Sequence, residues 1–131
     1  MSKPAFRSIC LGSLLAIGPT LGLMLWFTPP AKANDPVIVE IKLEQGHFVL
    51  VPAEIKITAG QSVKWVPIEK DFDVAHHLAP ATSSDAFEET HDFDSSNPPT
   101  RTFNTPGVVH YFCKKHPKTM VGTITVTPAN Q

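Results

Sequence analysis

The residues best suited to chemistry lie in one short stretch near the C-terminal end. Cys113 stands three residues before His116, and Met120 follows that histidine by four residues. A thiolate, an imidazole and a thioether form a soft donor set that copper prefers, whereas zinc usually takes more thiolates, or imidazoles without a thioether. The spacing of these three residues therefore predicts a copper site.

A site of this kind needs a second histidine from elsewhere in the chain. Blue-copper centres use two histidines and one cysteine in a plane, with a weak axial methionine. The adjacent residues His76 and His77 can supply the second imidazole from a distant strand. The remaining histidines are interpreted as surface or structural residues: His47, His91 and His110.

Two other interpretations of the cysteine are weaker. A lone cysteine is most often a small buried hydrophobe, and a cysteine with a histidine can be the nucleophile and base of a protease. Cys113 and His116, three residues apart at a strand end, come with no third residue that would orient such a pair. We therefore expect a metal site and no catalytic residues.

The elements that position these residues are predicted to be short β-strands. Apolar and polar residues alternate from Val37 on, and turn signals recur about every ten residues, which is typical of an antiparallel β-sandwich or barrel. The fold class is therefore all-β. The strands are expected near 37–43, 48–51, 55–57, 63–66, 108–112 and 123–127.

The stretch 80–101 interrupts this pattern, because it has few β-branched and many acidic residues. It is either a solvated acidic loop or a docking surface for a basic partner, and 83–90 could form one short helix. Its carboxylates are expected on a side face: Asp85, Glu88, Glu89, Asp92 and Asp94. Three lysines beside the copper loop form either a solvated face or a patch that steers an acidic partner: Lys114, Lys115 and Lys118.

The first part of the chain has the pattern of a secretory signal peptide. Two basic residues precede an uncharged stretch over 9–27, and a small-residue cleavage site ends at Ala33. A retained transmembrane anchor is the alternative, because this stretch is nearly long enough to span a bilayer. We expect a signal peptide over 1–33 and one domain over 34–131, exported to a periplasm or a thylakoid lumen, with no membrane span after cleavage.

Length and charge limit the function further. The chain has 131 residues with 11 basic and 12 acidic side chains, and this balance excludes a strongly basic nucleic-acid binder. One domain of this size cannot hold a dinucleotide-binding unit together with a substrate domain. Cys113 is the one cysteine expected after cleavage. A lone thiol in an oxidising compartment is protected when a metal occupies it.

The C-terminal stretch also follows a longer pattern. It runs through Pro106-Gly107 and Tyr111-Phe112-Cys113 to His116, Met120, Gly122, Ile124 and Val126. This pattern resembles that of the cupredoxins, specifically the plastocyanin, pseudoazurin and amicyanin group. Two details depart from it. The gap between His116 and Met120 is one residue shorter than in plastocyanin and one longer than in amicyanin, and the upstream motif H-N-V is replaced by His76-His77-Leu78.

The resemblance implies a Greek-key β-sandwich that holds one type 1 copper ion and transfers single electrons. Matching Leu78 to the apolar residue of the upstream motif selects His76 as the ligand, with His77 as the alternative. His116 would then lie on an exposed loop and serve as the electron port. The implied metal ligands are His76, Cys113, His116 and Met120.

The expected function is that of a soluble, monomeric electron carrier between larger redox proteins, such as a cytochrome or a membrane complex. The alternative is a periplasmic copper carrier or buffer. Carriers usually hold Cu(I) with several methionines or histidines, whereas one methionine is expected after cleavage. A copper enzyme such as a nitrite reductase would need a second copper site and more than one domain. We therefore expect no enzymatic activity.

Overall fold

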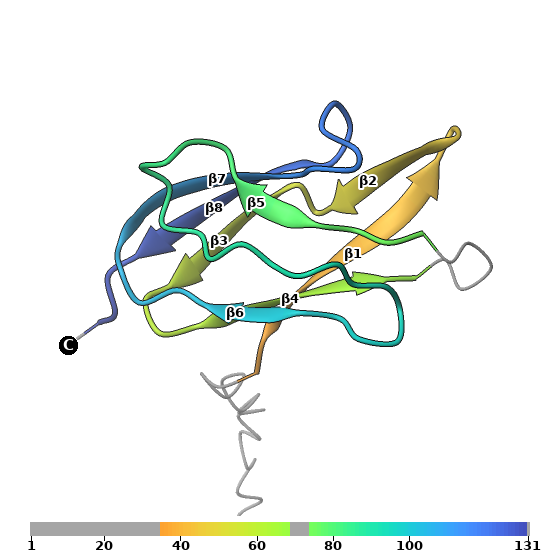
Figure 1. Ribbon diagram of the computed structural model, residues 1–131. Helices are drawn as coiled ribbons and strands as arrows, with labels where there is room; N and C mark the ends of the chain where they lie inside the picture. Colours follow the sequence, from red (N-terminus) through yellow and green to blue (C-terminus); the bar gives the residue numbers. More distant parts are fainter. Residues whose placement is uncertain (1–34, 69–73, 131) are drawn as a thin grey trace, which may run out of the picture.

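The computed structural model describes residues 35–68 and 74–130, so the predicted signal peptide over 1–33 lies outside the described residues. Eight strands form two sheets that pack face to face (Figure 1). The strands are β1 (Val37–Glu44), β2 (His47–Val51), β3 (Glu54–Thr58), β4 (Ser62–Pro67), β5 (Leu78–Pro80), β6 (Thr100–Thr102), β7 (Gly107–Cys113) and β8 (Val121–Thr127). The predicted all-β sandwich is confirmed.

Strand pairing in the two sheets is only partly antiparallel. The first sheet has the order β2-β1-β4-β6 and the second the order β3-β8-β7-β5. β1 pairs with β4, and β3 with β8, in parallel, whereas the other pairs are antiparallel. The expectation of an antiparallel sandwich is wrong for these two pairs. Alternation within a strand carries no signal about the direction of its neighbour. The chain crosses between the sheets in a Greek-key manner.

Alternation within the strands places one face of each sheet in the core. Val63 and Trp65 of β4 are fully buried, and so is Ile124 of β8. The Trp65 Nε1–H donates a hydrogen bond of 2.9 Å to the Tyr111 hydroxyl oxygen. Burial raises the pKa of Tyr111 to about 12, so its hydroxyl stays neutral. This pair links the first sheet to the second across the core.

The connection between β5 and β6 contains no helix, so the helix expected over 83–90 is wrong. The chain turns at 81–85 instead, where the Asp85 carboxylate accepts hydrogen bonds from two main-chain N–H groups. Thr82 donates at 2.9 Å, and His110 of β7 donates at 2.7 Å. The second donor is distant in the sequence and favours this turn over a helix. The described part of the chain offers no helix that could span a bilayer.

Asp85 gives the fold a dependence on pH. Hydrogen bonds from the His110 main chain and the Thr82 hydroxyl lower the Asp85 pKa from 3.8 to about 2. A lowered pKa in the folded state stabilises the protein above the unfolded value, and this contribution is lost as the pH falls from about 4 to about 2. Asp85→Asn is expected to remove this part of the pH dependence.

The measurement is the free energy of unfolding of both proteins between these pH values, because other carboxylates also titrate in this range. The difference between wild type and Asp85→Asn should be largest at neutral pH and should shrink toward pH 2. A constant difference across the whole range would contradict the role given to the Asp85 carboxylate.

Candidate metal centre

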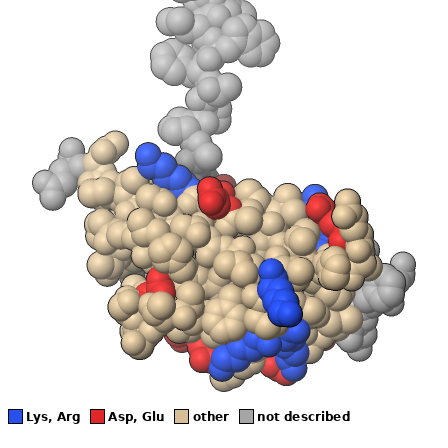
Figure 2. All heavy atoms as spheres, turned by 90° about the horizontal axis from the view of Figure 1, so that it is seen from above, with Lys and Arg blue, Asp and Glu red and all other residues tan. Residues whose placement is uncertain are grey.

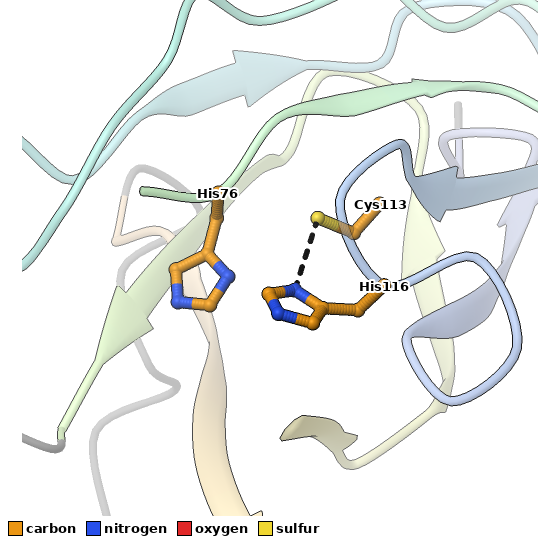
Figure 3. A group of neighbouring side chains, drawn as sticks. All are labelled: His76, Cys113 and His116. Atoms are coloured by element: carbon orange, nitrogen blue, oxygen red, sulfur yellow. Dashed lines mark hydrogen bonds between the residues drawn. The ribbon is translucent and has the colours of Figure 1, made fainter. Parts of the chain in front are cut away.

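Three side chains gather at one end of the sandwich, beside the loop between β7 and β8. They are His76, Cys113 and His116, and one ligand atom from each lies within 4.8 Å of the other two. Figure 3 shows the two imidazoles and the thiol pointing toward one another. Cys113 Sγ lies 3.8 Å from His116 Nδ1. Of the two histidines proposed for the second imidazole, His76 lies in this group.

The pairing of β5 with β7 explains how distant residues meet. Leu78 lies opposite Cys113 in this pair, so His76, two residues upstream, reaches the end of β7. The His76 main chain is held by Phe93, with hydrogen bonds of 2.8 and 3.0 Å that form an isolated bridge. The position of His76 therefore depends on the connection between β5 and β6 as well as on β5.

A tight loop returns His116 to the end of β7. The His116 main-chain N–H donates to the Cys113 carbonyl at 3.1 Å, and the Met120 N–H donates to the His116 carbonyl at 3.0 Å. The Cys113 N–H in turn donates to the Met120 carbonyl at 2.9 Å. This last hydrogen bond places the main chain of Met120 beside that of Cys113. The Met120 side chain is fully buried.

The burial and protonation of the histidines fit a metal ligand set. His76 is 1 % exposed, and its Nδ1 has no hydrogen-bond partner among the described residues. Burial, with a contribution from His116, lowers the pKa of His76 to about 4. Burial and the charge of Lys115 also lower the pKa of His116. Neutral imidazoles with a free lone pair, beside a thiol, are the donors that copper takes.

Aromatic rings cover the two histidines. The Phe48 ring of β2 lies 5.1 Å from the His76 ring and 4.9 Å from the His116 ring, measured between centroids. Phe93 lies 5.8 Å from His76 on another side. Nothing in the alternation of apolar and polar residues along β2 distinguishes a ring over the core from a ring over a metal site, so the sequence gives no signal for this role of Phe48.

His77 faces away from this group but contacts it through the main chain. Its N–H donates to Cys113 Sγ at 3.4 Å. Its ring lies between two carboxylates, with Nδ1 at 2.7 Å from Asp92 Oδ1 and Nε2 at 2.6 Å from Glu89 Oε1. His77 therefore makes an outer contact to the thiol rather than contributing its imidazole.

Two of the three lysines beside the loop are paired with acidic residues. Lys114 donates to the Glu89 carboxylate, and Lys115 donates to Asp92 Oδ2 at 2.9 Å. Figure 2 shows basic side chains gathered over the β7–β8 loop with acidic ones at the edge, on a face that is otherwise largely uncharged. The expectation that all five carboxylates lie on a separate side face is wrong for Glu89 and Asp92. The remaining histidines are exposed, as expected: His47, His91 and His110.

Comparison with known proteins places these residues in a family context. The model of the copper binding proteins of the plastocyanin/azurin family matches residues 37–127. A purple cupredoxin from Nitrosopumilus maritimus is similar in structure, with a TM-score of 0.58 and 21% identity over 70% of this chain and 99% of that chain. Amicyanin from Paracoccus versutus has a TM-score of 0.54 and 31% identity over 71% of this chain and 82% of that chain.

A copper-containing nitrite reductase from Thermus scotoductus SA-01 is also similar, with a TM-score of 0.57 and 25% identity. This match covers 73% of this chain but 23% of that chain. The similarity to the reductase is therefore confined to one part of a much longer protein.

Proposed function

This chain belongs to the plastocyanin/azurin family of copper-binding proteins, and we propose that it carries single electrons between larger redox proteins. The observation that supports this function best is the set of His76, Cys113 and His116, with ligand atoms within 4.8 Å of one another. When bound, copper would supply a one-electron couple between Cu(I) and Cu(II). A single ion held by one thiolate and two imidazoles is suited to electron transfer.

We propose four ligands for the copper ion. His76, Cys113 and His116 would bind it strongly, and Met120 would be the weak axial ligand. Strand pairing and main-chain hydrogen bonds hold Cys113 and His76 in place. Full burial of Cys113 and Met120 excludes water from their sulfur atoms. Ligands that stay in place keep the rearrangement between redox states small.

His116 would connect the site to a redox partner. It is the candidate ligand with a partly exposed side chain, whereas His76, Cys113 and Met120 are buried. A partner that docks over the β7–β8 loop would come closest to the metal at the His116 ring. Beside the basic side chains over this loop, the face seen in Figure 2 is largely uncharged.

The carrier function is favoured over an enzyme by the site itself. Within the described residues, His76, Cys113 and His116 are the only group of three or more potential ligands of this kind. The nitrite reductase that this chain resembles is a much longer protein, of which the match covers 23%. We therefore propose one copper ion and no catalytic residues for this domain.

Optical and EPR spectra of the copper-loaded protein test the proposed function. We expect an intense visible band from thiolate-to-copper charge transfer, the EPR signature of a type 1 centre, and reversible one-electron oxidation and reduction. A protein that stays colourless and retains only Cu(I) would instead be a copper carrier or buffer, and the electron-transfer proposal would be wrong.

The two adjacent histidines are expected to differ in their effect on copper binding. His77→Ala keeps the main-chain N–H that contacts the Cys113 sulfur, so its cost in metal affinity should not exceed the roughly 10- to 100-fold typical of a lost outer contact. His76→Ala removes a ligand and should cost more than that, together with the visible band. Copper titration of both variants measures the difference. A larger loss for His77→Ala would move the ligand by one position.

Met120→Leu is expected to retain copper and colour but to shift the reduction potential, since a weak axial ligand tunes a site rather than holding it. Leucine has a similar volume in this fully buried position, so the folding cost should stay below about 1.5 kcal/mol. Voltammetry and the visible spectrum of the variant measure these effects. Loss of all copper would contradict the axial role of Met120.

A further inference from the structure

Hydrogen bonds hold the middle of the acidic connection between β5 and β6 to Leu78 of β5 and to Arg101 of β6. Thr90 is buried and exchanges hydrogen bonds with Leu78, whose main-chain N–H donates to Thr90 Oγ1 at 2.9 Å. The Thr90 N–H donates back to the Leu78 carbonyl at 2.9 Å. Arg101 donates to the carbonyl oxygens of Glu88 and Glu89, each at 3.1 Å. These contacts fix the backbone that carries the two carboxylates facing His77.

Glu89 and Asp92, called the carboxylate pair below, hold the His77 ring from both sides. A carboxylate oxygen only accepts hydrogen bonds, so a ring nitrogen that carries a proton donates to the carboxylate that it faces. The two distances are 2.6 Å to Glu89 and 2.7 Å to Asp92. With two opposed contacts, the ring can neither rotate nor swing away without losing at least one of them.

The same carboxylates also bind the loop between β7 and β8. Glu89 pairs with Lys114 and Asp92 with Lys115. Lys114 and Lys115 are the two residues between Cys113 and His116, so the carboxylate pair links the His77 ring to the start of that loop. Single exposed ion pairs contribute little stability. Here two carboxylates each serve two donors, and such a network can hold a geometry that isolated pairs do not.

The main chain of His77 contacts two consecutive residues, Cys113 at the end of β7 and Lys114 at the start of the β7–β8 loop. Its N–H donates to Cys113 Sγ at 3.4 Å, and its carbonyl accepts from the Lys114 N–H at 2.8 Å. Fixing the ring therefore limits how far this peptide can move relative to the thiol. A hydrogen bond to the thiolate draws charge from the sulfur, so its geometry affects the electronic properties of a bound metal.

We propose that Glu89 and Asp92 are positioning residues, which hold the His77 main-chain N–H against the Cys113 sulfur through the His77 ring. Their effect on copper rests on the proposed function, whereas their effect on the His77 peptide does not. The acidic connection then acts as an outer support of the site, instead of a freely solvated loop or a docking surface for a basic partner.

Hydrogen exchange of the His77 amide tests this inference directly. The main variant is Glu89→Ala combined with Asp92→Ala, compared with wild type as the full chain loaded with Cu(I), which is diamagnetic and suits NMR. We expect the His77 amide to exchange about tenfold faster in the double variant. The His77 ring loses its contacts with Glu89 and Asp92, and each exposed contact of this kind is worth up to about fivefold in the opening equilibrium. The Cu(II) form should show a shifted charge-transfer band and reduction potential.

Glu88→Ala is the matched control. Glu88 lies in the same connection, its side chain is 83% exposed, and its nearest cation is Arg101 at 3.9 Å. The Glu88→Ala substitution removes one negative charge but no contact of His77, so it should leave the exchange rate of the His77 amide unchanged. An exchange rate in the double variant within twofold of wild type, or equal to that of the control, would overturn the inference.

A second double variant separates geometry from charge. Glu89→Gln combined with Asp92→Asn removes both charges but keeps an oxygen that can accept from the His77 ring. We expect this variant to recover most of the His77 amide protection. Equal loss of protection in both double variants would mean that the carboxylates act as charges only, and would overturn positioning. If wild type takes up no type 1 copper, the proposed function fails, while the exchange comparison in the same chains still decides the inference.

Discussion

Cys113→Ser is expected to abolish the intense visible band of the copper-loaded protein completely. That band needs a thiolate ligand, and a serine hydroxyl at the same buried position is a harder and much weaker ligand for copper. The remaining donors would be His76, His116 and Met120, which lack an anionic group. We therefore also expect a large loss of copper affinity, measured by titration and by the visible spectrum.

The control for this variant is Cys10→Ser, which alters the other cysteine of the chain and should leave colour and copper content unchanged in the full-length protein. The unfolding transition of metal-free Cys113→Ser shows whether the variant still folds. An intense visible band that survives in folded Cys113→Ser would contradict the assignment of Cys113 as the thiolate ligand.

Most of the strands, and the two site residues Cys113 and His116, could be predicted from local patterns. Alternating burial follows directly from the two-residue period of a strand, as in β4 and β8. The short interval from Cys113 to His116 fits within one tight loop, so spacing alone brings these residues together. Adjacent residues on an extended chain point to opposite sides, so only one of His76 and His77 can face the site. Local sequence does not say which side faces it, and the choice of His76 therefore needed the family resemblance.

The surroundings of the site could not be predicted in the same way. Glu89 and Asp92 meet His77 across 12 and 15 residues of irregular chain, which has no period from which contacts could be read. Asp85 was assigned to a possible helix from local residue types, but one of its two shortest hydrogen bonds comes from the main chain of His110, on strand β7. Contacts of this kind depend on how the connection packs on the finished sheets.

Gly122→Ala is expected to destabilise the fold by about 1–3 kcal/mol, the usual cost of forcing extra volume into a packed core. A Cβ at this position would lie 2.4 Å from Tyr111 Cζ, well inside van der Waals contact. The Tyr111 ring cannot easily move away, because it stacks on Phe87 at 5.0 Å and accepts a hydrogen bond from Trp65. Gly122 is also two residues from Met120, so strain here would reach the candidate axial ligand.

A thermodynamic cycle with Tyr111→Leu identifies the cause of this destabilisation. Gly122 and Tyr111 lie directly opposite each other on β8 and β7, and removing the ring removes the clash. Chemical denaturation should therefore give a smaller cost for Gly122→Ala in the Tyr111→Leu background, with a coupling energy of about 0.5–3 kcal/mol. Equal costs in both backgrounds would mean that glycine is required for its backbone conformation. A lower cost in the Tyr111→Leu background would show that β8 carries a glycine at position 122 to make room for the Tyr111 ring.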